Sequence, residues 1–512
     1  MEAVKIIEIC KVAPPSSLPS TTLPLTFFDI PWFFISHPIQ RIFFYDFPYP
    51  THHFLQTTLP TLKHSLSLTL QHFFPFASNI TVPPQRRHSS IRYLNGHDSV
   101  PFTVAEYSKA EHFTTLTSNS PQDIRNLHPL LPTLPPPRVE KDGTRVLPIM
   151  AIQVTILPNS GFTLGLTYNH VVADGKSLHH FIKHWACVCK EKRDAFSSIK
   201  GSYLSLPSHE RHNVKDPNEL KLLYLQVLER LESQQKTSCP SRAAAYLASD
   251  TPNKDFLHTQ YLKSEILPKQ YQNTSHLDQP SIVEKDVFTT NNKVRSTIVL
   301  TGEQVEKLKK YVALKCTDSG TTSHISTFVV TCSLIWVCLL KSEQGKGKCI
   351  DGEQLCYFGF VADSRDQFSL PSTYFGNCLV SCYVKVKRGV VVGENGMVEV
   401  AFAIERKVRD FKGSGGALRE AEKPISEFME PWKPGNSLLT VAGSPNLAVY
   451  KTDFGWGNPR KSEAVHIDAG SISLSDCRYQ NGAIEVGLVL ERIQMNNFIN
   501  ILQHQLKILV SD

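Results

Sequence analysis

The chain has 512 residues, of which 41% are hydrophobic and 20% are charged, and this profile predicts a globular protein with more than one domain-sized unit. The net charge is +7, but the basic residues are scattered and form no run with interleaved aromatic residues, so nucleic acid is not an expected partner. The mild positive balance would suit a small anionic ligand.

The start of the chain, MEAVKIIEICKVAPP, shows no long apolar segment with a cleavage site, and the cysteines form no CxxC pair. We therefore expect a cytoplasmic protein with reduced cysteines. The segment 4–12 predicts a strand, and leucines at helical spacing from Leu59 to Leu70 predict a helix. Asn95-Gly96, between two strand-like runs, predicts a hairpin.

A second hairpin is expected at 149–170, with its turn at 158–161 and with His170 at the end of its return strand. A helix follows, because apolar residues recur on one face from Leu178 to Cys189. The opposite face of this helix is predicted to meet solvent and carries His179, His180, Lys183 and His184.

The composition from 191 to 292 is polar and poor in aromatic clusters, which predicts a linker between two domains at 1–190 and 293–512. Within this linker, about 233–290 is expected to be an insertion, partly without regular structure.

The second half predicts a further set of strands and helices. A strand ends at Leu300, and Thr301 with Gln304 forms a capping-box signature for the next helix. The most apolar stretch, 325–341, is interrupted by Ser, Thr and Cys and is too short for a membrane span, so we predict a buried helix and no membrane partner. Later strands are expected at 354–361, 377–386, 467–477 and 483–491, before a closing helix at 496–509.

His170 and Asp174 lie between the predicted strand and the predicted helix. A neutral imidazole on such a turn can act as a general base, while the aspartate could either orient the imidazole or anchor the loop through an ion pair. The same spacing recurs at His212 and Asp216, but that pair lies in the polar linker with no strand before it, so we interpret it as a chance match.

Other chemistries are less well supported. His170, Asp174, His180 and His184 could bind zinc, but Lys183 shares the helical face of the last two, so no metal is expected. No G-x-S-x-G nucleophile elbow, phosphate-binding loop or supported dinucleotide fingerprint is visible. Downstream, Gly455 and Gly457 flank a tryptophan in YKTDFGWGNPRK, which indicates special backbone geometry in a turn.

Three motifs in this order, HVVADG at 170–175, YFGNC at 374–378 and DFGWG at 453–457, resemble the signature set of the BAHD family of plant acyl-CoA-dependent acyltransferases. The opening LPLTFFDIPWFF…HPIQRIFFY resembles the branch of that family that malonylates glucosides of anthocyanins and other flavonoids. The resemblance covers nearly the whole chain except about 233–290.

The resemblance implies an α/β fold of two chloramphenicol-acetyltransferase-like domains, with mixed sheets flanked by helices and a channel between them. The N-terminal domain carries His170 as the general base, and the C-terminal domain carries the other two motifs. The implied protein is a monomeric acyltransferase that moves an acyl group directly from acyl-CoA, a co-substrate, and needs no cofactor. Trp456 is then expected to donate its indole N–H to the tetrahedral oxyanion.

The resemblance also implies structural roles. Asp174 is expected to face away from the site and to pair with an arginine, for which Arg295 occupies the expected position. Gly175 follows this aspartate in the same motif. Asp453 is expected to hold the DFGWG loop together with Gly455 and Gly457.

Malonyl-CoA is the expected donor and a phenolic glucoside the expected acceptor. The malonyl carboxylate would need a cation, and Lys176 or Arg365 could supply it. The branch commonly shows a second basic residue where this chain has Gln367. The alternatives are a hydroxycinnamoyl-CoA-dependent transferase of the same acceptors and a non-catalytic binder of small molecules on the same fold.

Overall fold

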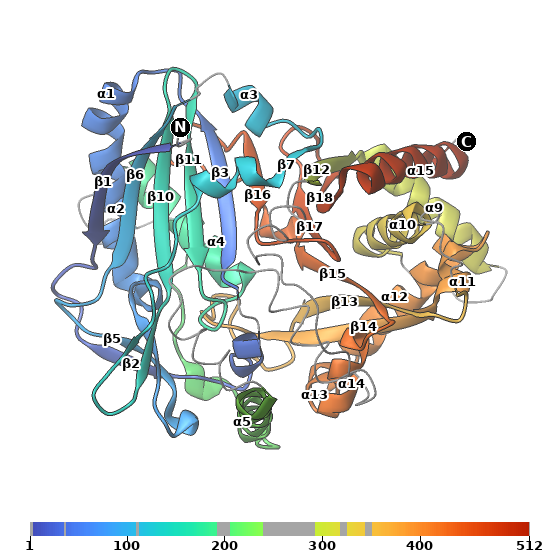
Figure 1. The fold of residues 1–512 in the computed structure, drawn as a ribbon, viewed down its shortest axis with the longest axis horizontal. Coiled ribbons are helices and arrows are strands. Elements are labelled where there is room, and N and C mark those ends of the chain that lie inside the picture. The colour runs from blue at the N-terminus through green and yellow to red at the C-terminus, as the bar shows by residue number, and fades with distance from the viewer. Residues whose placement is uncertain are drawn as a thin grey trace, which may run out of the picture.

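The computed structural model describes residues 4–34, 37–108, 112–191, 205–238, 292–317, 325–343 and 351–510. Two units lie side by side, each built on a mixed sheet with helices packed against it (Figure 1). Most of the predicted insertion at 233–290 lies outside the described residues. The predicted α/β class, with mixed sheets flanked by helices, is therefore confirmed.

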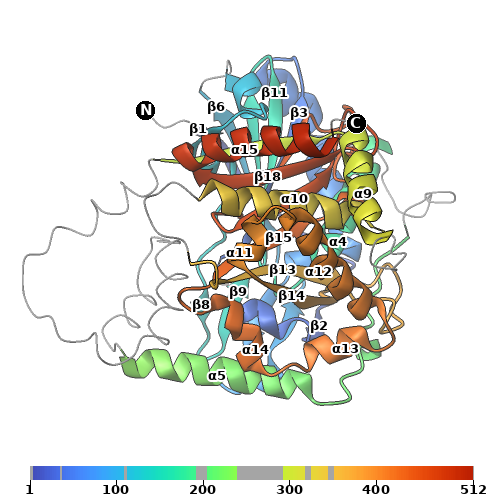
Figure 2. The same ribbon diagram turned by 90° about the vertical axis from the view of Figure 1, so that its right-hand side faces the viewer.

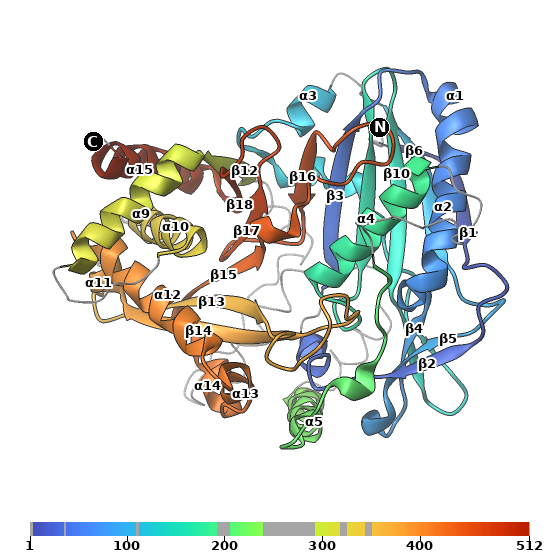
Figure 3. The ribbon, with the colours of Figure 1, turned by 180° about the vertical axis from the view of Figure 1, so that it is seen from behind.

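The N-terminal sheet has six strands, and its apolar residues alternate with the pleat so that each face forms a core. In spatial order the strands are β1 (Val4–Val12), β6 (Val100–Tyr107), β10 (Met150–Leu157), β11 (Gly161–Tyr168), β3 (Ile39–Asp46) and β16 (Lys461–Ala464). Helices α2 (Leu59–His72) and α4 (Gly175–Glu191) cover one face (Figure 3). The segment 113–131, which includes α3 (Phe113–Leu116), covers the other.

The hairpin predicted at 149–170 is confirmed, because β10 and β11 pair in antiparallel register from Met150–Tyr168 to Leu157–Gly161. The hairpin predicted at Asn95-Gly96 is wrong. The strand before this turn, β5 (Ser90–Tyr93), belongs to a small separate sheet, whereas β6 pairs with β1 and β10. Asp98 accepts a hydrogen bond from the N–H of Leu94 at 2.8 Å, so the turn is closed locally while the strands diverge.

Helix α4 has the predicted apolar face, since the residues from Leu178 to Cys189 on that face are buried. The expectation that its other face is solvated is wrong, because His179 and His184 are each only 2% exposed. The ring of His179 packs against Phe43 of β3 and the ring of His184 against Phe73, the C-cap residue of α2. Neighbouring elements therefore bury more of the surface of α4 than the spacing of its apolar residues indicates.

The C-terminal sheet has seven strands with a layer of helices on its outer side (Figure 2). The predicted buried helix is α10 (Thr327–Ser342), in which 13 residues are buried. The capping box is confirmed by reciprocal hydrogen bonds between Thr301 and Gln304 at 2.9 and 3.1 Å. The strands are β14 (Leu379–Lys387), β13 (Leu355–Asp363), β15 (Ser437–Gly443), β17 (Ser471–Asp476), β18 (Ile484–Glu491), β12 (Lys293–Leu300) and β7 (Gln122–Asp123).

Further elements complete the two units. The small sheet contains β2 (Thr21–Pro24), β5, β4 (Asn79–Val82), β9 (Arg145–Pro148) and β8 (Arg138–Val139). The remaining helices are α1 (Thr51–His53), α5 (Leu220–Ser238), α9 (Gly302–Thr317), α10 (Thr327–Ser342), α11 (Arg388–Val392), α12 (Gly396–Lys412), α13 (Gly416–Ala421), α14 (Ile425–Met429) and α15 (Arg492–Val510). Within the described ranges, no helix combines the length and the apolar character that crossing a bilayer requires.

The two large sheets exchange strands. Strand β16, from the last part of the chain, pairs with β3 of the N-terminal sheet, with Ala464 opposite Arg41. Strand β7, from the first part, pairs with β12 of the C-terminal sheet, with Asp123 opposite Val294. The boundaries at 190 and 292 stay a prediction, and elements from each side of them complete the sheet of the other side.

Candidate active site

His170 lies directly after β11, on a short loop that leads into α4. The amide N–H of Asn169 donates to the carbonyl of Ile149 at 2.8 Å, and its side chain accepts from the N–H of Val171 at 3.1 Å. The half-buried imidazole stacks on the indole of Trp32, with ring centroids 3.4 Å apart and an interplanar angle of 8°. The ring plane is therefore set by a neighbour from the first 40 residues.

The partner of the imidazole is Asn377, the asparagine of YFGNC. Its Oδ1 lies 3.2 Å from Nδ1 of His170, and its Nδ2 donates to the carbonyl oxygens of His170 and Val171 at 2.9 and 3.0 Å. The same Nδ2 lies 3.0 Å from Oδ1 of Asp29, in the N-terminal FFD stretch. Segments far apart in the chain thus meet at the histidine.

Burial lowers the pKa of His170 to about 4. A hydrogen bond from the ring to the backbone of His170, the contact with Asn377 and the charge of Asp29 oppose this shift only in part. The neutral imidazole is therefore the stable form near pH 7. A neutral imidazole with an unprotonated ring nitrogen can take a proton from a hydroxyl group.

Asp174 does not contact the imidazole. Its Oδ1 accepts the N–H of Ser177 at 2.9 Å and so caps α4, while its Oδ2 accepts the N–H of Cys378 at 3.2 Å and lies 2.8 Å from a guanidinium nitrogen of Arg365. Both charged groups of this ion pair are at most 1% exposed. The prediction that Asp174 faces away and pairs with an arginine is confirmed, and it is the anchor of the loop.

The choice of Arg295 as that arginine is wrong. Arg295 lies on β12 and pairs with Glu463 of β16 at 2.5 Å, with both side chains 3% exposed. Its ion pair therefore ties the two large sheets together, whereas Arg365, just after β13, is placed beside the YFGNC loop.

The expectation that Arg365 could bind a donor carboxylate is also wrong. Its guanidinium is 1% exposed, forms an ion pair with Asp174, and already donates to Asp363 and to the carbonyls of Tyr374 and Gly376. Lys176, the other candidate, is 42% exposed and pairs with Asp363 at 2.9 Å. Such an exposed pair is worth little energetically and leaves the lysine able to exchange partners.

The DFGWG loop has the predicted structural form. Oδ1 of Asp453 accepts the N–H groups of Gly455 and Gly457 at 2.8 and 2.9 Å, and the carboxylate pairs with Lys190 of α4 at 2.6 Å. The two glycines have φ angles of +110° and +93°, which side chains with a Cβ rarely adopt. At Gly175, by contrast, a Cβ would meet only Cδ1 of Leu447, at 3.4 Å, so this packing does not require glycine.

The expectation that Trp456 donates to an oxyanion beside His170 is wrong. Its ring packs on Phe454 and on Phe162, with centroids 6.1 and 5.6 Å apart. Phe162 lies at the start of β11, whereas His170 follows the end of that strand, so the two are separated by roughly 25 Å at about 3.3 Å per residue. The partly buried indole packs against the N-terminal core.

The second histidine–aspartate pair has no comparable setting. His212 is 74% exposed and lies beside Glu210, while the carboxylate of Asp216 accepts the N–H groups of Leu220 and Lys221 at the start of α5. The interpretation of this spacing as a chance match is consistent with these contacts.

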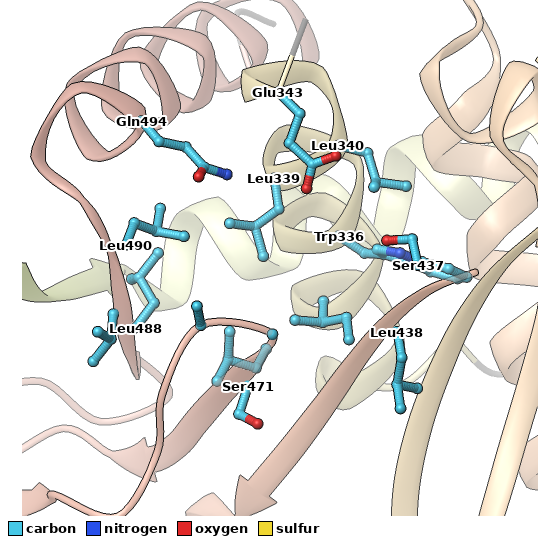
Figure 4. A pocket seen from close by; sticks show the side chains of 15 residues that line it. Trp336, Leu339, Leu340, Glu343, Ser437, Leu438, Ser471, Leu488, Leu490 and Gln494 are labelled. Carbon is cyan, nitrogen blue, oxygen red and sulfur yellow. The ribbon is translucent and has the colours of Figure 1, made fainter. Parts of the chain in front are cut away.

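Two other possibilities are a metal site and a cavity that could bind a ligand. Among the described residues, no three His, Cys, Asp or Glu side chains converge as metal ligands would. A cavity of about 130 Å³ lies in the C-terminal unit between α10, α15 and the strands β15, β17 and β18 (Figure 4). Its lining is mostly aliphatic and includes none of the candidate site residues.

Sequence reasoning missed several residues that the structure places around His170. Trp32 and Asp29 lie in the stretch used only as evidence of resemblance, and Asn377 lies in a motif used in the same way. Arg211, in the polar linker, is 3% exposed and pairs with Asp29 at 2.6 Å. A lone arginine in a polar stretch carries no signal of burial, so only the folded arrangement shows its role.

Comparison with known proteins identifies the family. The chain matches the Transferase family over residues 2–504. It is 36% identical to the coumaroyl-CoA:anthocyanidin 3-O-glucoside-6''-O-coumaroyltransferase 1 of Arabidopsis thaliana, over 99% of this chain and 98% of that protein. It is 33% identical to the malonyl-coenzyme A:anthocyanin 3-O-glucoside-6''-O-malonyltransferase of Dahlia pinnata, over 96% of this chain and 95% of that protein.

Solved structures agree on the fold. Vinorine synthase superimposes with a TM-score of 0.59 and 17% identity, over 98% of both chains. F. graminearum TRI101, solved with coenzyme A and T-2 mycotoxin, superimposes with a TM-score of 0.61 and 12% identity, over 93% of this chain and 96% of that one. The chain belongs to the BAHD family of acyl-CoA-dependent acyltransferases.

The corrected ion pair gives a first prediction. Removing one member of the buried Asp174–Arg365 pair leaves a charge without a partner, so Asp174→Ala and Arg365→Ala should each lower the free energy of unfolding by about 3–5 kcal/mol. The double variant should cost less than the sum by about 1–3 kcal/mol, measured by denaturant unfolding. Asp174→Ala combined with Arg295→Ala is the control and should be additive; coupling in the control but not in the first pair would contradict the assignment.

The DFGWG loop gives a second prediction. Trp456→Phe keeps a ring in the core and removes only the indole N–H, so turnover should stay within about threefold of the wild type, whereas loss of a true oxyanion donor costs about 10²–10³-fold. Gly457→Ala places a Cβ at a positive φ and should destabilise the fold by roughly 1–3 kcal/mol. Thermal melts and steady-state assays test both predictions. A hundredfold loss of turnover in Trp456→Phe would show that the indole N–H does stabilise the oxyanion.

Proposed function

We propose that the protein transfers an acyl group from acyl-CoA to a sugar hydroxyl of a phenolic glucoside, with His170 as the general base. The observation that carries this proposal is the half-buried imidazole held by Asn377 at the junction of the two units. Its pKa, lowered by burial to about 4, favours the neutral form. The relatives that act on anthocyanin glucosides support the acceptor class.

In the proposed reaction, a ring nitrogen of His170 accepts the proton of the sugar hydroxyl as its oxygen attacks the thioester carbonyl carbon. The tetrahedral intermediate collapses by breaking the carbon–sulfur bond. The departing CoA thiolate takes the proton from the imidazolium, which returns the neutral imidazole. No acyl-enzyme and no bound cofactor is required, because the co-substrate supplies the activated acyl group.

For the donor we propose malonyl-CoA, as in the Dahlia pinnata relative. A malonyl carboxylate that leaves water must be paired with a cation. Arg41 on β3 is 7% exposed, and its one hydrogen bond among the described residues runs from Nη1 to Oγ of Ser462 at 2.9 Å. No described carboxylate lies within ion-pair distance of this guanidinium.

Arg41 and the proposed base both act on a third side chain, His466. Burial lowers the pKa of His466 to about 3, and the charges of Arg41 and His170 both add to this shift, so the three side chains share one electrostatic neighbourhood. Burial lowers the pKa of Arg41, and the charge of Glu463 opposes this shift without a direct ion pair. A nearly buried guanidinium with no ion-pair partner among the described residues supports an acidic group on the donor.

A second candidate donor is a hydroxycinnamoyl-CoA. The two coumaroyltransferases of Arabidopsis thaliana are 36% and 35% identical to this chain, which favours an aromatic acyl group. The loss of Arg365 as a free cation favours it as well. An aromatic donor would need apolar surface and no cation at the acyl end.

The role of His170 gives a third prediction. His170→Ala should reduce turnover by about 10²–10⁴-fold, the usual contribution of a general base, and His212→Ala should leave turnover unchanged. Because the lowered pKa of about 4 keeps the base neutral, kcat/KM should stay level from pH 7 down and fall only near pH 4. Undiminished transfer in His170→Ala, or equal losses in both variants, would instead favour a binder without catalysis.

The donor gives a fourth prediction. Arg41→Gln keeps a polar side chain but removes the charge, so the ratio of malonyl to acetyl transfer should fall by roughly 10- to 150-fold, the worth of a charge-assisted hydrogen bond. Lys176→Ala is the comparison, because it removes an exposed cation. The ratio is measured by mass spectrometry of the product from mixed donors; if neither change alters it, or if only coumaroyl-CoA is used, the malonyl donor is wrong.

A further inference from the structure

We infer that Asn377, itself held by Asp29, is a positioning residue that fixes His170 in the tautomer with hydrogen on Nδ1, so that Nε2 is the basic nitrogen. This inference rests on the proposed role of His170 as the base. It assigns a physical role to the YFGNC and FFD stretches, which the sequence alone presents only as signatures.

The orientation of the Asn377 amide follows from its neighbours. One of its two terminal atoms lies 2.9–3.0 Å from three oxygens, namely the carbonyls of His170 and Val171 and the carboxylate of Asp29. All three oxygens can only accept hydrogen bonds, so the atom that faces them must be the NH₂ group. A flipped amide would bring its oxygen against three acceptors at once.

The tautomer of the imidazole follows from the amide. With the NH₂ group so placed, Oδ1 of Asn377 faces Nδ1 of His170 at 3.2 Å and can only accept. Nδ1 must therefore carry the hydrogen, which leaves the lone pair on Nε2. A hydrogen bond from the ring to the backbone of His170 itself favours the same tautomer, and Asn377 adds to it. The stack on Trp32 holds the ring plane, so Nε2 points in one direction.

Asp29 holds the NH₂ group of Asn377, whose oxygen faces the imidazole. It is fully buried, and its Oδ2 accepts from the N–H and the hydroxyl of Thr26 at 2.7 and 3.0 Å and from Nη1 of Arg211 at 2.6 Å. Its Oδ1 remains for the amide of Asn377. Because four donors fix this carboxylate, it can hold the amide, which holds the imidazole, as a connected chain of hydrogen bonds.

The neutral amide between the carboxylate and the imidazole has a chemical consequence. A carboxylate bonded directly to Nδ1 would favour the imidazolium and raise its pKa strongly, whereas an amide oxygen orients the ring with a smaller effect. When the imidazolium forms during transfer, its Nδ1–H still donates to the amide oxygen. The charged groups that act on it are Asp29, which stabilises it, and His37 and His466, which oppose it when protonated.

The tautomer itself can be measured in the wild-type protein. In the protein with ¹⁵N-labelled histidine, the imidazole shifts distinguish Nδ1–H from Nε2–H, and the His170 signals are assigned by their loss in His170→Gln. We expect Nδ1–H at pH 7. A wild-type protein with hydrogen on Nε2 would overturn the inference, even if His170→Ala abolishes transfer.

The variant that tests positioning is Asn377→Leu, which keeps the branched shape of the side chain and removes the acceptor. We expect kcat to fall roughly 10- to 100-fold, with KM for acyl-CoA within about threefold. The share of the Nδ1–H tautomer should fall, because only the bond from the ring to the backbone of His170 remains to favour it. Cys382→Ala, in the neighbouring strand β14 and equally buried, is the control for packing and should change neither the tautomer nor the kcat-to-KM pattern.

A second variant separates orientation from packing. Asn377→Asp alone would set a second carboxylate about 3.0 Å from that of Asp29, so it is combined with Asp29→Asn, which returns a donor between the two side chains. The double variant restores an acceptor oxygen beside Nδ1, so it should recover the Nδ1–H tautomer and move the acid limb of kcat/KM to higher pH than in the wild type. In Asn377→Leu that limb should move to lower pH, because the bond that favours the imidazolium is gone. An unchanged tautomer and an unchanged limb in Asn377→Leu would overturn positioning, whereas full activity in His170→Ala would overturn the proposed base instead.

Discussion

The buried ion pair between Asp174 and Arg365 holds the site together. Each charge is almost fully removed from water, so neither can lose the other without a large cost. The same aspartate caps α4 and binds the backbone of Cys378, directly after Asn377. One carboxylate therefore fixes the histidine loop relative to the YFGNC loop, and the modest hydrogen bond between His170 and Asn377 does not have to hold two domains in register.

Much of the local structure could be predicted, because it depends on signals close together in the sequence. The helical spacing of α4 and the capping box at Thr301 give local patterns that the structure repeats. The failed hairpin at Asn95-Gly96 shows the limit, since a turn signal does not specify which sheet the next strand joins. His179 was placed in solvent for the same reason, because contacts from other elements bury it.

The residues of the candidate site also fall into those that local sequence signals could predict and those that only the folded arrangement reveals. His170 and the glycines of DFGWG could be found, because a strand end and a positive φ leave marks in the sequence. The partner of Asp174 could not, because two arginines were compatible with the pattern and only the sheet topology separates them. Trp456 was misplaced because its motif says nothing about which end of β11 it packs against.

Strand β16 adds a consequence for biosynthesis. This short strand, Lys461–Ala464, closes the edge of a sheet whose other five strands lie within the first 168 residues. During translation, β3 therefore remains an unpaired edge of the N-terminal sheet until residues 461–464 have been made. Unpaired edge strands tend to pair with strands of other chains. About 290 residues separate the last of the other five strands, which ends at Tyr168, from β16. While these residues are being made, low concentration, chaperones or surface charge must prevent β3 from pairing with another chain.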